Sequence, residues 1–312
     1  MRHPDQKQIK VIYYTDPVCS TCWILDPYLK KLQLKFGDLL DIEYRMGGLI
    51  MECDEAGNSG GCPDFCVATL WKNESNKHNV QLGGEVWKKD PVKSTIPPSL
   101  GYYAALRQSK KKAELFLRAI KEKIFLQEKN IGTEEKVVTA AIECGLNLHQ
   151  FMADWQSSST RARFNRHLLE KTKWEVTSFP TLIFINHDGE IEYGLCPTKG
   201  YKYDEIYNDW ERIIGKFSGS NLPEIHEKPK LIPLLKNESR FSTKNIQIIC
   251  EYKSEIETLH ALENALLDGV IIKEKHDSID FWRYNKTGFN IRKDQYRIKD
   301  TTIVGGGVCG RY

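Results

Sequence analysis

Residues 9–36 read IKVIYYTDPVCSTCWILDPYLKKLQLKF, and this stretch decides the fold. It opens as a short apolar strand over residues 9–14 and continues as a helical pattern over about residues 20–36, with Cys19 and Cys22 at the junction. A Cys-x-x-Cys in this position puts the first sulfur at a helix N-terminus, where unpaired N–H groups and the helix dipole favour the thiolate. Cys19 is therefore predicted to be the nucleophile, and Cys22 to resolve a mixed disulfide.

A second signal lies far downstream, where residues 176–185 read VTSFPTLIFI. A proline directly before a β-rich apolar run fits the first position of a strand. Taken together with the cysteine pair, this position makes the Phe179-Pro180 bond a candidate cis bond.

The order of these signals resembles the thioredoxin superfamily: strand, Cys-x-x-Cys, helix kinked at Pro27, then x-Pro-Thr leading a strand. The match covers roughly residues 8–217. Residues 16–23, DPVCSTCW, and 44–49, YRMGGL, resemble the DsbA and FrnE-like branch. Residues 23–33, WILDPYLKKLQ, also resemble a subgroup of ClpXP adaptors that carry the same fold.

The resemblance implies roles for individual residues. The loop with Pro180 is expected to pack against the cysteine pair and to shape a peptide groove, with Trp23, Phe179 and Thr181 along it. The two residues between the cysteines, Ser20-Thr21, include no histidine, so a strongly oxidising potential is not expected. A reductase or isomerase role also suits a cytosolic protein better than net disulfide formation does.

The predicted fold class is α/β: a thioredoxin-like fold with a helical insertion, plus a small C-terminal α+β domain. The first domain spans residues 1–217, with the insertion at about 98–173, where apolar residues recur with helical spacing. A Gly-, Ser- and Pro-containing linker is expected over 218–244. The domain over 245–312 has no role that its pattern reveals.

Shorter elements complete this prediction. In the first domain we expect strands over residues 41–46, 181–186 and 190–194, and a closing helix over 203–216. In the second domain we expect three strands and one helix, in chain order: a strand at 246–250, a helix at 255–267, and strands at 270–272 and 279–282.

Charge and hydropathy narrow the partners. The 45 basic and 42 acidic residues nearly cancel and form no long block of one sign, so no nucleic acid is expected. No stretch is long enough to span a bilayer, and the first 15 residues lack an apolar export segment, so we expect a cytoplasmic protein without a membrane partner. No cofactor is expected, and the expected partners are protein or peptide thiols and disulfides.

Three cysteines in a Gly- and Asn-rich loop region form a candidate second thiol site: Cys53, Cys62 and Cys66. If Pro63 starts a helix, Cys62 and Cys66 share one face within disulfide reach. A second redox pair, metal binding and inert surface thiols all stay open for this loop. Zinc ligation by Cys19 and Cys22 together with Cys62 and Cys66 is the rival to redox chemistry; we favour redox chemistry and predict no metal site.

Two functional hypotheses follow. The first is a cytoplasmic thiol-disulfide oxidoreductase, reductase- or isomerase-like, that uses Cys19, Cys22 and Pro180. The second is an adaptor on the same fold that presents a client to a protease such as ClpXP, with the cysteines serving at most as a redox sensor.

Overall fold

The computed structural model describes residues 8–51, 65–219, 228–237, 240–276 and 279–286. The chain divides into two compact units, residues 1–227 and 228–312, which are described separately below. The thioredoxin-like fold class predicted from the sequence is confirmed for the first unit. The domain limits drawn from the sequence stay predictions.

A four-stranded sheet in the order β2-β1-β3-β4 is the centre of the first unit. The central strand β1 (Ile9–Thr15) runs parallel to β2 (Leu40–Met46) and antiparallel to β3 (Thr181–Ile185), which pairs with β4 (Ile191–Tyr193). Six of the seven residues of β1 are buried, as expected for a strand covered on both faces. The predicted strands of this unit are all confirmed.

The two faces of β1 enter different apolar clusters because successive side chains of a strand alternate. Val11 and Tyr13 pack with α1 (Ser20–Phe36) and α9 (Tyr203–Ser218). Ile12 and other residues of the opposite parity pack on the other side, against Val176, Ile183 and their neighbours. The Cys19–Cys22 helix is thus anchored on the sheet by its apolar face, and it continues through Pro27.

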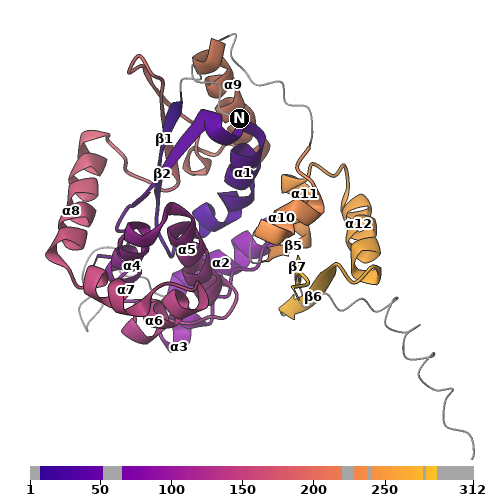
Figure 1. The fold of residues 1–312 in the computed structure, drawn as a ribbon, viewed down its shortest axis with the longest axis horizontal. Coiled ribbons are helices and arrows are strands. Elements are labelled where there is room, and N and C mark those ends of the chain that lie inside the picture. Colours follow the sequence, from indigo (N-terminus) through magenta and orange to yellow (C-terminus); the bar gives the residue numbers. More distant parts are fainter. Residues whose placement is uncertain (1–7, 52–64, 220–227, 238–239, 277–278, 287–312) are drawn as a thin grey trace, which may run out of the picture. The chain divides into compact units, whose positions relative to one another are not determined.

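The described part of the chain between β2 and β3 is largely helical, which confirms the predicted insertion. Its helices are α2 (Phe65–His78), α3 (Val86–Lys89), α4 (Ile96–Gln108), α5 (Lys110–Phe125), α6 (Glu134–Glu143), α7 (Leu148–Trp155) and α8 (Ser158–Lys173). Figure 1 shows α4 to α7 gathered into one group, with α8 leading back towards the sheet. N-caps at Ser109, Asn147 and Ser157 each accept a hydrogen bond from a backbone N–H of the helix they start.

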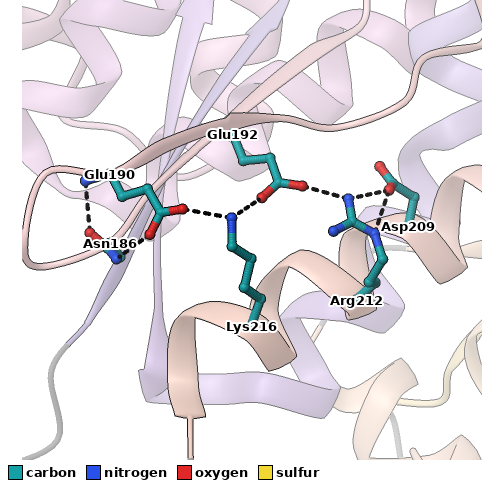
Figure 2. Close-up of polar contacts among 6 residues, drawn as sticks. All are labelled: Asn186, Glu190, Glu192, Asp209, Arg212 and Lys216. Carbon is teal, nitrogen blue, oxygen red and sulfur yellow. Dashed lines mark hydrogen bonds and ion pairs between the residues drawn. The ribbon is translucent and has the colours of Figure 1, made fainter.

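A continuous series of polar contacts joins the β3–β4 hairpin to α9, and Figure 2 shows its members: Asn186, Glu190, Lys216, Glu192, Arg212 and Asp209. Glu192 is central, with oxygens 2.9 Å from Lys216 Nζ and 2.6 Å from an Arg212 nitrogen. Asp209 also accepts a hydrogen bond of 2.8 Å from the backbone N–H of Leu195. Such exposed pairs are individually weak, but this series fixes the start of the segment between β4 and α9.

The second unit holds a three-stranded antiparallel sheet in the order β5-β7-β6. Its elements are α10 (Leu231–Asn237), β5 (Phe241–Ser242), α11 (Thr243–Ile249), α12 (Glu255–Leu267), β6 (Ile271–His276) and β7 (Ile279–Tyr284). The predicted helix at 255–267 and the strands near 270–272 and 279–282 are confirmed. A helix and a short strand also lie within the stretch that we expected to be a linker.

The strand predicted at residues 246–250 is wrong, because the chain forms α11 there. Ser242 caps this helix by accepting a hydrogen bond of 3.2 Å from the backbone N–H of Asn245. Ile246 and Ile249, three residues apart, are both fully buried on one helical face. Capping and burial thus override the β-propensity of the isoleucine run.

Candidate functional site

Three strands of the sheet, β1, β2 and β3, have an end close to the cysteines. Thr15 ends β1 beside Met46, the last residue of β2, and Tyr14 pairs with Thr181, the first residue of β3. The backbone N–H of Gly47 donates to the Thr15 carbonyl at 2.7 Å. The three loops that leave these strand ends are therefore held together around the start of α1.

Cys19 is the N-cap of α1, and Cys22 lies in the first turn. The two sulfurs form a disulfide, and the Cα atoms are 5.2 Å apart. The backbone N–H of Cys22 donates to Cys19 Sγ at 3.1 Å, which is the contact that stabilises a thiolate at a helix start. Cys19 is 6% exposed and Cys22 is fully buried, so Cys19 is the more accessible cysteine of the pair, and the roles of nucleophile and resolving thiol stay predictions.

The Phe179-Pro180 peptide bond is cis, as predicted. Pro180 is buried, while Phe179 is half-buried. The Phe179 ring covers Gly47, where an added Cβ would overlap the ring carbons. Lys171 lies against the same pair: its Nζ donates to the Gly47 carbonyl at 2.9 Å and sits 5.5 Å from the centre of the Phe179 ring.

A fully buried carboxylate, Asp16, shapes the turn before the cysteines. One carboxylate oxygen of Asp16 accepts a hydrogen bond from the backbone N–H of Val18 at 3.2 Å. The backbone carbonyl of Asp16 accepts one from the backbone N–H of Cys19 at 3.1 Å. The other carboxylate oxygen accepts from the backbone N–H of Leu49 at 2.8 Å and from the Thr95 hydroxyl at 3.1 Å. Burial raises the pKa of Asp16 to about 6, although these hydrogen bonds act in the opposite direction.

The helical insertion supports α1 behind the cysteines. Trp23 is 3% exposed, its ring stacks on Phe125 of α5 at 5.2 Å, and Arg118 lies 4.2 Å from the ring centre. One turn further along α1, Asp26 forms an ion pair with Lys121, which is almost fully buried. The insertion is therefore packed directly on the helix that carries the thiols.

A cleft of about 530 Å³ begins at Ser20 and Thr21, the two residues between the cysteines. Its remaining lining comes from α1, from α2 and from the segment that leads into α9: Tyr28, Leu70, Glu74, Lys77, His78, Pro197, Gly200, Tyr201, Lys202, Tyr203 and Asp204. The Tyr203 ring stacks on Tyr28 at 5.7 Å and meets His78 edge-on at 4.9 Å. This volume is in the range of small-molecule sites.

The predicted site residues fall into two groups. Cys19, Cys22 and Pro180 lie at one end of the sheet: Cys19 caps α1, Cys22 lies in its first turn, and Pro180 directly precedes β3. Trp23 is packed inside and the Thr181 hydroxyl donates to the Ser178 carbonyl at 2.8 Å, so a role of either toward a substrate stays a prediction, as it does for Phe179.

The second thiol site lies mostly beyond the described residues. Cys53 and Cys62 are outside them, and Cys66 is exposed near the start of α2. Burial raises the pKa of Cys144 and of Cys250 to about 12, so neither is a reactive thiol at neutral pH. Within the described ranges, no group of three His, Cys, Asp or Glu side chains is placed to hold a metal ion.

Two features of the site escaped the sequence interpretation. Lys121 occupies the apolar stripe of α5 four residues after Leu117 and three before Ile124, and a lysine in such a stripe is a detectable signal for a buried ion pair. The cleft walls had no such signal, because Leu70–His78 and Pro197–Asp204 are far apart in the sequence.

Known proteins are similar in sequence to most of this chain. The ClpXP adapter protein SpxH of Halalkalibacterium halodurans is 26% identical over 296 residues, which cover 90% of this chain and 92% of that protein. SpxH of Bacillus subtilis is also 26% identical, over 255 residues that cover 81% of each chain. In the described ranges, no helix has the length and apolar character needed to cross a membrane.

Solved structures with the same fold cover about two thirds of this chain. The cytosolic disulfide reductase DsbM from Pseudomonas aeruginosa has a TM-score of 0.50 and 18% identity over 66% of this chain and 98% of its own. A candidate protein disulfide isomerase from Nitrosomonas europaea has a TM-score of 0.57 and 15% identity over 67% of this chain and 99% of its own. The family model described as thioredoxin matches residues 13–208, and the chain belongs to that family.

Proposed function

We propose that this chain is an adaptor that presents client proteins to the ClpXP protease. The observation that carries the proposal is the extent of the likeness to SpxH. A match over 90% of the chain reaches well into the second unit, because the first unit ends at Glu227. The solved redox proteins cover only 66–67% of the chain. The second unit is thus shared with adaptors, and the cytoplasmic location expected from the sequence belongs to the same proposal.

Pulse-labelled protein half-lives test the adaptor role in three strains: wild type, one without this chain and one without ClpX. Clients are the proteins whose half-lives lengthen in both deletion strains. We expect a small shared set, and degradation of its members by purified ClpXP should accelerate when this chain is added. A shared set that is empty, or degradation that the chain leaves unchanged, contradicts the proposal.

A second candidate function, thiol-disulfide exchange, is favoured by the position of Cys19. In the reduced protein, a Cys19 thiolate attacks a substrate disulfide, one substrate sulfur leaves as a thiolate, and a mixed disulfide remains. Cys22 then attacks Cys19, which releases the second substrate sulfur and forms the Cys19–Cys22 disulfide. The contact from the Cys22 N–H to Cys19 Sγ stabilises the attacking thiolate.

Paired variants separate the two functions. Cys19→Ser should abolish reduction of insulin or of a small disulfide, whereas client degradation should persist in Cys19→Ser with Cys22→Ser. If the double variant also stops client degradation while remaining folded, the cysteines belong to the delivery mechanism. If the wild type does not reduce any disulfide, the exchange function is excluded.

A further inference from the structure

The cleft beside the Cys19–Cys22 motif has a charge pattern of its own. It contains two acidic and two lysine side chains, and the acidic ones have partners. Glu74 lies 3.2 Å from His78 one turn along α2, and Asp204 hydrogen-bonds the Tyr28 hydroxyl. Asp204 also lies in the first turn of α9, where the helix dipole stabilises a negative charge.

The two lysines are differently placed. Lys77 lies in the last turn of α2, and Lys202 is the residue directly before α9. Both are exposed, and among the described residues neither has a carboxylate within ion-pair distance. The two lysines and the two carboxylates balance in charge, but the carboxylates already have hydrogen-bonding partners, whereas the two lysine side chains, from two separate elements, are the charged groups left to contact a ligand.

We propose that this cleft selects small disulfides that carry carboxylates, and holds them with one sulfur at Cys19 and the carboxylates on Lys77 and Lys202. Ser20 and Thr21 line the cleft and directly follow Cys19, so a ligand in it lies beside the reactive sulfur. A volume of about 530 Å³ suits a molecule of tripeptide size better than a folded protein segment. The aromatic walls formed by Tyr28, Tyr201 and Tyr203 suit the aliphatic parts of such a molecule.

The chemistry balances without any further reactant. The Cys19 thiolate attacks one sulfur of the small disulfide, a new S–S bond to Cys19 forms, the original S–S bond breaks, and one small thiolate leaves. The small disulfide is the oxidant, and attack by Cys22 completes oxidation of the protein pair. This inference rests on the thiol-disulfide exchange proposed for Cys19, and it adds the class of small molecule that enters.

Three disulfides of different charge test the selection in full-length reduced protein that carries Cys22→Ser, so that the mixed disulfide on Cys19 persists. They are glutathione disulfide, which is anionic, hydroxyethyl disulfide, which is neutral, and cystamine, which is cationic. Mass spectrometry follows modification of Cys19 at pH 7 and low salt. The rate of each probe with the protein is divided by its rate with a free thiol. We expect this ratio to be higher for glutathione disulfide than for the neutral probe, and lower for cystamine. Both differences should shrink at high salt.

Charge-neutral variants locate the effect. Lys77→Gln and Lys202→Gln should each slow the glutathione disulfide reaction about two- to fivefold, the range of an exposed ion pair, while the hydroxyethyl disulfide rate stays constant. Lys111→Gln is the matched control, because Lys111 is an exposed lysine of α5 that does not line the cleft. Equal slowing by Lys111→Gln, no slowing by either cleft variant, or a preference for cystamine overturns the inference. If no probe modifies Cys19, the exchange function itself fails.

Discussion

The Nζ of Lys121 lies 3.0 Å from both carboxylate oxygens of Asp26. The lysine comes from α5 in the insertion, and the aspartate lies one turn beyond Cys22 in α1. The lysine side chain is 2% exposed and the aspartate 19%. This ion pair joins the insertion to the helix of the thiols in a setting where loss of either partner leaves a poorly solvated charge.

Lys121→Met should therefore lower the free energy of unfolding by about 3 kcal/mol, because the Asp26 carboxylate loses its counterion. Urea denaturation of the oxidised protein measures this change. Lys111→Met, an exposed position on the same helix, should change the free energy by less than about 0.5 kcal/mol. Adding Asp26→Leu to Lys121→Met should restore most of the loss; a double variant less stable than Lys121→Met alone would contradict this explanation.

Asp16 should give the protein a pH-dependent stability. Its pKa is about 6 in the folded protein and 3.8 in the unfolded chain, so between these values the folded state holds a proton that the unfolded state has released. The contribution of Asp16 to the free energy of unfolding therefore rises as the pH falls from 7 to 4.5, by about 2 kcal/mol.

The comparison with Asp16→Asn isolates this effect. His167 acts in the opposite direction, because burial lowers its pKa to about 4 and its protonation favours the unfolded state. The difference between wild type and Asp16→Asn cancels that contribution. We expect wild type to gain on the variant as the pH falls; a difference that is flat between pH 7 and 4.5 would show that Asp16 is ionised throughout.

Alkylation should distinguish the thiols of the reduced protein. At pH 6.5, iodoacetamide should modify Cys19 well before Cys144 and Cys250, because a helix-terminal thiolate persists at a pH where thiols with a pKa raised to about 12 remain protonated. Peptide mass spectrometry gives the order. The exposed Cys66 is replaced by serine in this experiment so that it does not compete. Modification of Cys22 ahead of Cys19 would reverse the roles assigned to the pair.

Gly47→Ala should displace Phe179, because the added Cβ would overlap its ring. We expect a loss of about 1–3 kcal/mol in the free energy of unfolding. If the overlap is the cause, the loss should be smaller in a Phe179→Leu background, which a double-mutant cycle measures. An additive result would place the strain elsewhere in the loop.

Much of the first unit could be predicted from the sequence because its signals are local. The β1 run, the cysteine pair and the x-Pro-Thr start of β3 each depend on a few consecutive residues, and the helical insertion repeats one spacing many times. The prediction for the α11 segment was wrong because three isoleucines within four residues are compatible with a strand as well as with a helix. The deciding cap, Ser242, precedes that run.

The cleft and the Lys121–Asp26 pair depend on tertiary structure instead. Lys121 is 95 residues from Asp26 in the sequence, and only the packing of α5 on α1 brings them together. The cleft needs the end of α2 and the segment before α9 to face Ser20 and Thr21. No local pattern encodes either arrangement. The one local signal is the position of Lys121 in the apolar stripe of α5, which indicates a buried ion pair but not its partner.

The cleft has a further consequence, for divergence among relatives. Cys19 and Cys22 are fixed by α1 and the sheet, whereas Lys77 is an exposed residue in the last turn of α2 and Lys202 lies on the connection that leads into α9. Exposed helix ends and connections tolerate substitution far better than a packed sheet does. A lineage can therefore acquire a new ligand preference through changes at these two places and still inherit the sulfur chemistry intact.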